Sequence, residues 1–330
     1  MRLLVTGGAG YIGSVVALQL LEAGHEVTVL DDLSKGHEAA VPSEAGFVRA
    51  SLLDAQRLTE TLTEGYDGVL HFAALSLVGE SVEQPGRYYR ANVAGTLNLL
   101  EAMGAAGVPR LVFSSTAAVY GEPEEVPIPE SAPTRPTNPY GGAKLAADQL
   151  IGFFAAAHGL SATSLRYFNV AGSAAGGTLG EDHEPETHLI PLVLAAALGE
   201  RANVKIFGTD YPTPDGTAVR DYIHVEDLGR AHLLALDAAD RAEPGEHRVY
   251  NLGNWAGFSV REVVEVARRV TGRRIEAVEA PRRAGDPPVL VASSVKIRAE
   301  LGWTPEQPAL EAMISDAWDW MQKHPRGYEG

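Results

Sequence analysis

Short apolar runs alternate with amphipathic segments through the first half of the chain. The apolar runs predict strands and occupy Arg2–Val5, Glu26–Leu30, Gly46–Val48, Gly68–His71, Arg110–Ser114 and Ser161–Arg166. Apolar positions at helical spacing predict helices between them, near Ile12–Glu22, Asp54–Thr63, Arg87–Ala106 and Pro139–Ala157. This alternation predicts a parallel sheet with helices on both faces and right-handed crossovers.

The regular alternation ends after about residue 167. Glycine and proline concentrate in Gly172–Gly180 and Asp210–Gly216, which predicts two loops. Helical patterns return at Pro191–Leu198, Val225–Ala238, Val260–Val270 and Leu310–Gln322. We therefore expect an α/β protein in which residues 1–170 form a doubly wound parallel sheet. Residues 171–330 should mainly form a smaller C-terminal α/β lobe, with some segments returning to the first domain.

Composition and charge narrow the function classes. The chain has 330 residues and a net charge of −16, which disfavours nucleic acid and anionic lipid as partners. The absence of cysteine excludes disulfides, thiolate nucleophiles and cysteine-ligated zinc, and we expect no metal site. The longest apolar run, Leu189–Leu198, is about half of what crosses a bilayer. The sequence also shows no secretory signal pattern. The expected location is therefore cytoplasmic.

A glycine-rich segment, Val5–Gly13, follows the first predicted strand and opens the first helix. Gly7 permits a tight turn, Gly10 lets the backbone approach a pyrophosphate, and Gly13 lets the helix pack closely on the strand. A turn without a ligand would also use glycines. However, Asp31 ends the second strand 18 residues after Gly13, where a carboxylate accepts hydrogen bonds from ribose hydroxyls. The segment predicts a Rossmann dinucleotide site, and Asp31 with Asp32 favours NAD over NADP.

Tyr140 and Lys144 lie four residues apart near a predicted helix start, so they share one helix face. Oxidising a secondary alcohol needs a base for the hydroxyl proton, and a phenol with a pKa of about 10 is too weak at neutral pH. A nearby ammonium and a cationic nicotinamide both favour the phenolate. Lowering the pKa by ~3 units corresponds to roughly 4 kcal/mol, which two close cations can supply. Beside the glycine loop, the pair predicts a catalytic base and its electrostatic partner.

Hydroxyl residues follow the fifth predicted strand in Ser114–Thr116. Ligands of doubly wound sheets bind beyond the C-terminal strand ends, so these hydroxyls should border the cofactor. Thr116 could then hydrogen-bond the reacting oxygen and pass its proton to Tyr140. A Ser/Thr cluster at a strand end also serves as ordinary turn chemistry, and the pattern alone does not decide between the two.

Taken together, these motifs resemble the UDP-glucose 4-epimerase family of extended short-chain dehydrogenases/reductases. The resemblance covers nearly the whole chain and includes, in order and spacing, the glycine loop, Ser114–Gly121, Tyr140 with Lys144, Leu165–Asn169, Asp210–Thr217, Val219–Val225 and Ala280–Arg283. It implies NAD binding by residues 1–170 and UDP-sugar binding mainly by residues 171–330. The implied activity is interconversion of UDP-glucose and UDP-galactose, part of galactose metabolism, through hydride transfer to tightly bound NAD and a 4-keto intermediate.

The resemblance also implies roles for individual residues. The catalytic ones are Tyr140, Lys144 and Thr116. The cofactor contacts are Gly7, Gly10, Tyr11, Ile12, Gly13, Asp31, Phe72, Ala73, Asn92, Ser114, Tyr140, Lys144 and Tyr167. The substrate contacts are Thr116, Asn169, His188, Leu189, Phe207, Arg220, Arg283, Asp286 and Leu290. Phe207 should stack on uracil, and the two arginines should meet the diphosphate.

Three positions depart from the family pattern. Ser76 replaces a lysine that often reaches the cofactor phosphates, and Ser51 replaces an acid near the adenine. His188 stands where some members have asparagine beside the diphosphate. The two serines bear on NAD retention and leave the reaction type unchanged.

Four alternatives and the assembly state remain open at this stage. A 4,6-dehydratase would need an Asp-Glu pair directly after Thr116, where this chain has Ala117 and Ala118. The sugar could also be a UDP-glucuronate or a UDP-N-acetylhexosamine, the latter because Leu290 stands where a bulky tyrosine excludes the acetamido group in some members. A nonenzymatic NAD-sensing regulator would need the glycine loop but not Tyr140 and Lys144. By analogy, Arg87–Ala106 and Pro139–Ala157 should pair two subunits as a homodimer.

Overall fold

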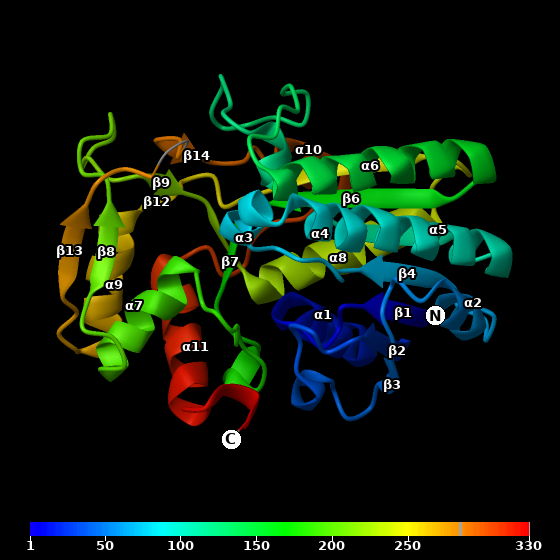
Figure 1. Cartoon of the computed structure of the whole chain (residues 1–330), viewed down its shortest axis with the longest axis horizontal. Coiled ribbons are helices and arrows are strands. Elements are labelled where there is room, and N and C mark those ends of the chain that lie inside the picture. The colour runs from blue at the N-terminus through cyan, green and yellow to red at the C-terminus, as the bar shows by residue number, and fades with distance from the viewer. Residues whose placement is uncertain (284–285, 330) are drawn as a thin grey trace.

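The fold is built around one parallel sheet, as the computed structural model of residues 1–283 and 286–329 shows (Figure 1). Within the described residues this sheet has seven strands in the order β11-β6-β5-β4-β1-β2-β3, all paired in parallel. The strands are β1 (Arg2–Thr6), β2 (Glu26–Asp31), β3 (Gly46–Arg49), β4 (Gly68–His71), β5 (Arg110–Ser114), β6 (Ser161–Tyr167) and β11 (His247–Leu252). The predicted doubly wound sheet is confirmed.

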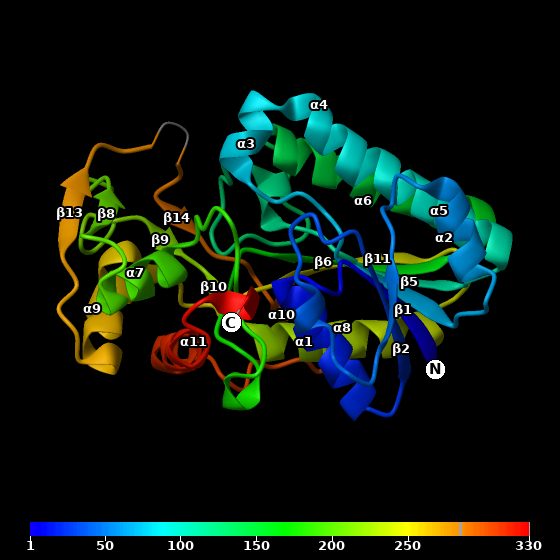
Figure 2. The ribbon, with the colours of Figure 1, turned by 60° about the horizontal axis from the view of Figure 1, so that its bottom comes forward.

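Helices cover both faces of the sheet because alternate strand residues point to opposite sides. Leu3 and Val5 of β1 pack with one set of helices, whereas Leu4 packs with the other. The first set is α1 (Tyr11–Glu22), α8 (Val225–Asp240) and α10 (Val295–Leu301). The second set is α2 (Ala55–Leu62), α5 (Gly95–Ala106) and α6 (Pro139–His158). Figure 2 shows α5 and α6 on one side of the sheet and α1 and α8 on the other.

The smaller lobe packs around α7 (Leu189–Leu198), α9 (Val260–Thr271) and α11 (Leu310–Lys323). Its strands form small sheets that join β8 to β13, β10 to β7, and β9 to β12 and β14. Their bounds are β7 (Asn169–Ala171), β8 (Val204–Phe207), β9 (Val219–Arg220), β10 (Tyr222–His224), β12 (Phe258–Ser259), β13 (Ala277–Ala280) and β14 (Val289–Leu290). The sequence patterns did not predict these strands, because strands of two to four residues are too short to show a period.

The helix predicted over Arg87–Ala106 is divided in the structure. It consists of α4 (Pro85–Tyr88), a π-helical turn η2 (Tyr89–Ala94) and α5, and the short α3 (Val78–Glu83) precedes it. The remaining short elements are the 3₁₀ turns η1 (Glu38–Ala40), η3 (Ala117–Tyr120), η4 (Ala175–Gly177) and η5 (Gly327–Glu329). A π turn inside a helix often marks a functional site, and this one carries Asn92 toward the cleft described below.

The chain passes back to the sheet after entering the smaller lobe. α8 and β11 lie on the sheet although they follow β10 in sequence, and Ile297 of α10 packs in the same core cluster. We therefore propose that residues 1–170 plus these returning segments form the cofactor domain, and that the rest forms the substrate lobe. No helix within the described ranges has the length and apolar character needed to cross a membrane.

Candidate active site

A single cleft of about 1330 Å³ lies between the lobes and gathers most of the predicted site residues. The C-terminal ends of β1, β2, β4 and β5 line one side, which is where doubly wound sheets bind ligands. The first turn of α7, together with β8, β9 and β14, lines the other side.

The glycine loop has no room for side chains at two of its positions. At Gly7, where φ is +74°, an added Cβ would lie 2.4 Å from the backbone nitrogen of Ala73. At Gly13 it would lie 2.2 Å from the carbonyl oxygen of Gly7. Gly10 is the N-cap of α1 and lines the cleft, so the first N–H groups of this helix are available to an anion. These features fit the pyrophosphate of a dinucleotide.

Asp31 lines the cleft at the end of β2. Its two carboxylate oxygens accept hydrogen bonds from the backbone N–H groups of Ala9 at 3.1 Å and Leu33 at 2.9 Å. Burial raises the pKa of Asp31, and these hydrogen bonds oppose that rise. A carboxylate has about four acceptor sites, so acceptor capacity remains for ribose hydroxyls. The geometry fits NAD, whereas a 2′-phosphate would place two anions side by side.

Asn92 lies behind the cofactor side of the cleft. Phe72 and Ala73 line the cleft, whereas Asn92 is absent from the residues that line it. The amide of Asn92 donates to the carbonyl oxygen of Leu75 at 2.9 Å and accepts from the N–H of Leu75 at 2.8 Å. Asn92 therefore holds the loop after β4 in place, and its contact with the cofactor stays a prediction.

Tyr140 and Thr116 form the central pair of the cleft. The Thr116 hydroxyl accepts the N–H of Ala118 at 3.1 Å and lies close enough to the Tyr140 phenol to lower its pKa. Pro139 occupies the first turn of α6, and the Asn138 side chain caps the helix by accepting the N–H of Gly141 at 2.9 Å. The cap and the proline fix the start of the helix, which places Tyr140 beside the end of β5.

The Lys144 ammonium is held at the end of β5. It donates to the carbonyl oxygen of Ser114 at 2.6 Å and lies 4.2 Å from the centre of the Phe113 ring. Burial lowers the pKa of Lys144 to about 7, although Asp148 opposes that shift. Burial also raises the pKa of Tyr140, and the hydrogen bond from Thr116 only partly opposes the rise. Activation of the phenol therefore has to overcome the effect of its burial.

Ser114 and Tyr167 complete the cofactor side, where both line the cleft with Tyr11 and Ile12. The hydroxyls of Ser114 and Tyr167 are hydrogen-bonded to each other. Since the Ser114 carbonyl also accepts the Lys144 ammonium, these residues form one continuous polar edge beside Tyr140.

Sequence reasoning missed Asp148, a buried neighbour of this edge. Asp148 follows Lys144 by one helical turn on α6. Its carboxylate accepts the Ser115 hydroxyl at 3.1 Å and pairs with Arg166 at 2.9 Å. The spacing of four residues from Lys144 was the available signal, but an acid on a helix is too common to single out.

The substrate lobe places its predicted residues around the opposite side of the cleft. The guanidinium of Arg283 lies 4.0 Å from the centre of the Phe207 ring. Arg220 is paired with Asp286. Half-buried Leu290 of β14 packs against the buried cluster that contains Val119, Tyr120 and Ile128. The Asn169 side chain donates to the carbonyl oxygen of Asp221 at 2.9 Å, and all of the predicted substrate contacts line the cleft.

His188 is the N-cap residue of α7, so that helix begins at the cleft, where Leu189 also lies. Burial alone would lower the pKa of His188, but the paired Glu181 carboxylate outweighs it and raises the pKa to about 9. Burial favours a raised pKa for Glu181, but His188 and His183 reverse this and hold it at about 2. A protonated imidazole at a helix N-terminus suits an anionic ligand.

The two serine substitutions lie in different surroundings. Ser76 lines the cleft, in the loop after β4. Ser51 precedes α2, where its hydroxyl accepts the N–H of Leu53 at 3.4 Å. Only Ser76 is therefore placed to alter the cofactor side directly.

Comparisons with known proteins show the family of the chain. Residues 3–253 match the model of the NAD dependent epimerase/dehydratase family. A UDP-glucose 4-epimerase of Streptomyces lividans is 59% identical over 99% of this chain and 98% of its own length. The structure of UDP-glucose 4-epimerase from Brucella ovis with NAD superposes with a TM-score of 0.93, at 44% identity, covering 96% of this chain and 97% of that one. The Bifidobacterium longum enzyme with NAD⁺ and UDP gives a TM-score of 0.92 at 37% identity, covering 99% and 100%.

Proposed function

The chain belongs to the NAD-dependent epimerase/dehydratase family, and we propose that it interconverts UDP-glucose and UDP-galactose by inverting the sugar at C4. The observation that carries this function is the juxtaposition of Thr116 and Tyr140 in a cleft whose other end fits NAD. Relatives that are 48–59% identical over nearly the full chain carry the name UDP-glucose 4-epimerase. An assay of UDP-glucose, UDP-galactose, their N-acetyl forms and UDP-glucuronate tests the assignment directly.

The residues of the cleft divide the chemistry between them. Tyr140 takes the proton of the C4 hydroxyl, and Thr116 hydrogen-bonds the same oxygen and relays the proton. NAD held by the glycine loop and Asp31 would supply a reversible hydride acceptor for C4, so no external oxidant would be consumed. Lys144, held by the Ser114 carbonyl, contributes positive charge at the cofactor side of Tyr140. Tyr140 returns the proton to the same oxygen after the 4-keto sugar has rotated in the cleft.

Inversion requires a firmly held nucleotide and a loosely held sugar. Arg220 and Arg283 lie at the substrate end of the cleft and supply the cations that a diphosphate needs in a chain of net charge −16. The start of α7 adds N–H groups and the His188 side chain to this end of the cleft. The Phe207 ring, on which Arg283 now lies, offers an aromatic face to uracil. The sugar can then rotate between Tyr140 and Leu290 while its UDP end stays fixed.

The cofactor is expected to remain bound through purification, because the enzyme must reuse the hydride that it removes. Denatured pure protein should release about one dinucleotide per chain, and this dinucleotide should lack a 2′-phosphate. Chromatography of the released nucleotide with phosphatase treatment measures both properties. Recovery of mainly NADP would overturn the role proposed for Asp31. Recovery of less than one NAD per chain would indicate that Ser76 weakens cofactor retention.

Two rival activities fit this cleft less well. A 4,6-dehydratase needs proton-transferring side chains after Thr116, but Ala117 and Ala118 line the cleft there. A regulator that only senses NAD has no need for the buried Tyr140 and Thr116 pair. The substrate assay must decide whether UDP-glucuronate is also converted, because the arginines of the cleft suit a carboxylate as well as a diphosphate.

Leu290→Tyr is expected to separate two classes of sugar. Leu290 lines the cleft and is only half-buried, so a larger side chain would project into the space where an N-acetyl group must turn. Overpacking costs about 1–3 kcal/mol, or roughly 5- to 150-fold in rate. The wild type should interconvert UDP-GlcNAc and UDP-GalNAc more weakly than the unsubstituted pair, and Leu290→Tyr should selectively lose that reaction.

The unsubstituted sugars serve as the internal control in the same assay. If Leu290→Tyr slowed both reactions equally, the role of Leu290 would be packing within its strand. If the wild type did not convert the N-acetyl substrates, the neighbouring loops would determine the size of the pocket.

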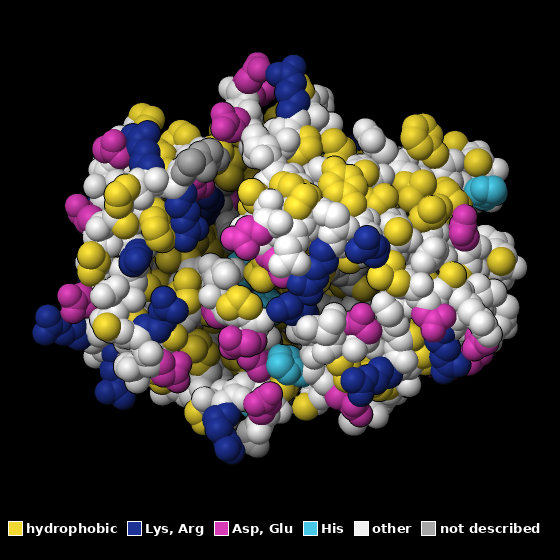
Figure 3. All heavy atoms as spheres, in the orientation of Figure 1, with side chains coloured by type: hydrophobic (Ala, Val, Ile, Leu, Met, Phe, Trp, Pro, Cys, Tyr) yellow, Lys and Arg dark blue, Asp and Glu magenta, His cyan; other side chains and the backbone are white. Residues whose placement is uncertain are grey.

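We propose a homodimer formed by α5 and α6. Figure 3 shows apolar side chains gathered over the region where Figure 1 draws these two helices. Phe153 of α6 is 73% exposed, and Tyr89 of η2 and Val82 of α3 are also exposed, on two segments that contact α6. An exposed apolar surface of this kind commonly marks a protein interface. Light scattering on the purified chain should give twice the monomer mass. A cytoplasmic location stays a prediction.

A further inference from the structure

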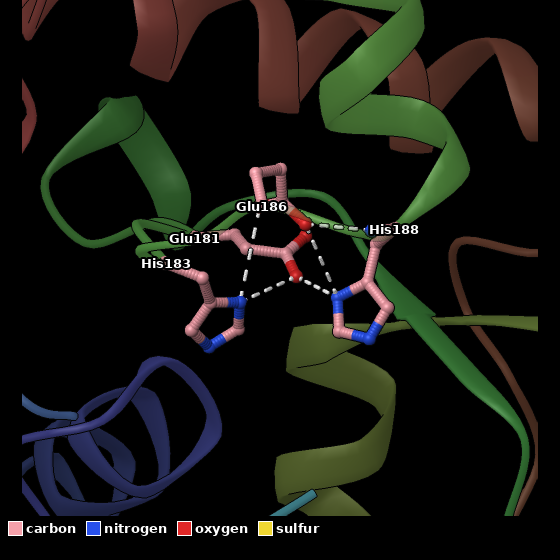
Figure 4. Close-up of side chains that lie close together, drawn as sticks. All are labelled: Glu181, His183, Glu186 and His188. Carbon is pink, nitrogen blue, oxygen red and sulfur yellow. Dashed lines mark hydrogen bonds and ion pairs between the residues drawn. The ribbon is translucent and has the colours of Figure 1, made fainter. Parts of the chain in front are cut away.

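Four side chains from one short segment converge at the edge of the substrate lobe. They are Glu181, His183, Glu186 and His188, in the loop that leads into α7. Figure 4 shows both imidazole rings turning one nitrogen toward the two carboxylates that lie between them. One ligand atom from each residue lies within 4.8 Å of all the others. The proposed epimerase chemistry uses only His188 of these four.

Three separations between these side chains lie near the edge length of a coordination tetrahedron. Bonds of about 2.1 Å from zinc to nitrogen and oxygen place neighbouring ligand atoms ~3.4 Å apart. The Nδ1 of His183 lies 3.2 Å from Glu181 and 3.8 Å from Glu186. The Nδ1 of His188 lies 3.8 Å from Glu186 and is also paired with Glu181. Small side-chain rotations would bring all four atoms to bonding distance of one ion.

We propose that Glu181, His183, Glu186 and His188 bind one divalent transition-metal ion per chain, with Zn²⁺ as the best fit. Two imidazole and two carboxylate ligands suit zinc and its neighbours in four-coordinate geometry. Mg²⁺ and Ca²⁺ prefer shells of oxygen ligands, so the two histidines disfavour them. Two carboxylates and two neutral imidazoles would also balance the charge of a divalent ion.

The surrounding contacts hold the ligands in place, as metal sites require. One oxygen of Glu186 accepts the N–H groups of Thr187 and His188, each at 2.6 Å. The carbonyl oxygen of Glu181 accepts the indole N–H of Trp320 at 3.2 Å, and the side chain of Glu181 is only 8% exposed. The loop is therefore tied both to itself and to α11.

The cluster is also accessible to an ion from two sides. Glu181 and His183 line the main cleft and also a second cavity of about 430 Å³ bounded by α7 and α11. His188 belongs to the main cleft and Glu186 to the second cavity. An ion at this position would lie at the boundary between the two spaces, without occupying the sugar end of the cleft near Tyr140.

Metal binding would define which nitrogen of His188 faces the substrate. With Nδ1 committed to the ion, Nε2 keeps its proton and remains a donor. Figure 4 shows the second nitrogen of His188 turned away from the carboxylates. The ion would therefore fix the start of α7 and leave His188 able to donate a hydrogen bond.

Calorimetric titration with ZnCl₂ tests the site independently of epimerase activity. The full-length protein with its bound cofactor is treated with a chelator, freed of it and titrated. We expect one Zn²⁺ per chain. His183→Gln and Glu186→Gln should each bind more than about tenfold more weakly, because even the loss of a residue behind a ligand costs 10–100-fold in affinity. Replacing Zn²⁺ with Co²⁺ should give the intense visible bands of tetrahedral coordination.

Two matched variants separate this site from adventitious surface binding. Glu184→Gln changes an exposed acid in the same loop, and His158→Gln changes an exposed histidine at the end of α6. Both should retain wild-type zinc affinity. Retained cofactor absorbance and an unchanged circular dichroism spectrum report that each variant is folded. The absence of stoichiometric binding, or equal binding by the wild type and His183→Gln, would overturn the proposal and leave the cluster as a network of ion pairs.

Discussion

Tyr140→Phe is expected to lower the epimerase rate by about 10²- to 10⁴-fold, the usual contribution of a general acid–base residue. Phenylalanine keeps the shape of the side chain and removes only the hydroxyl that takes the C4 proton. The Thr116 hydroxyl would still accept the N–H of Ala118, so the local fold should persist. UDP affinity should stay near that of the wild type, because the nucleotide contacts proposed here come from the other lobe.

Steady-state kinetics with a coupled assay, together with calorimetric UDP binding, measure both expectations. Thr116→Ala should lose less activity, since water can partly replace a hydroxyl. Tyr66→Phe removes a phenol hydroxyl outside the residues that line the cleft and serves as the matched control. Burial raises the pKa of Tyr140, so the wild-type rate should fall as the pH is lowered and the phenolate is lost. Near-normal turnover by a folded Tyr140→Phe would move the base to another residue.

Gly13→Ala is expected to expel the cofactor and lower the rate by about 10²-fold or more. The new Cβ would lie 2.2 Å from the Gly7 carbonyl oxygen and 2.9 Å from Gly8 Cα, both of which are backbone atoms. Relief therefore requires the loop and α1 to separate by about an ångström, and a misplacement of this size can cost ~10²-fold in rate. Alanine stabilises helices relative to glycine by about 1 kcal/mol. A loss of cofactor and activity in Gly13→Ala could therefore not be attributed to helix propensity.

Gly104→Ala provides the matched control within α5. An added Cβ at Gly104 meets nothing within 4 Å among the described residues, and the residue is likewise helical. This variant should keep its NAD and be as stable as the wild type or slightly more stable. The released dinucleotide per chain and the thermal unfolding midpoint are the measurements. A Gly13→Ala protein with full NAD content and full activity would show that the close packing is dispensable.

The sequence predicted the first half of the fold well because its strands are buried and local. The strand at Gly68–His71 was predicted with the bounds it has, and the strand from Ser161 differs by one residue at its end. β11 could not be found in the same way. Its first three residues are only partly buried, which weakens the apolar pattern. Its partner β6 also lies some 80 residues earlier, and no local signal reports such a pairing.

In the candidate site, too, the local motifs were predictable and the side-chain contacts were not. Motifs placed at strand ends, such as the glycine loop, Asp31 and Thr116, line the cleft as predicted. The hydrogen-bond partner of a side chain was less accessible, and the sequence did not predict that Lys144 donates to the Ser114 carbonyl. The convergence of Glu181 with His183 was missed because it depends on the path of a loop. An alternation of acids and histidines in sequence does not fix that path.

The return of α8, β11 and α10 to the sheet constrains how the protein can be made. The core around Leu165 is closed by Tyr250 of β11 and by Trp303, which lies just after α10. When β6 leaves the ribosome, these partners have not been synthesised. At roughly 5–20 residues per second, the wait until Trp303 is on the order of ten seconds. During that interval the nascent chain carries an open sheet edge at β6, which makes it a substrate for chaperones at an identifiable stage of translation.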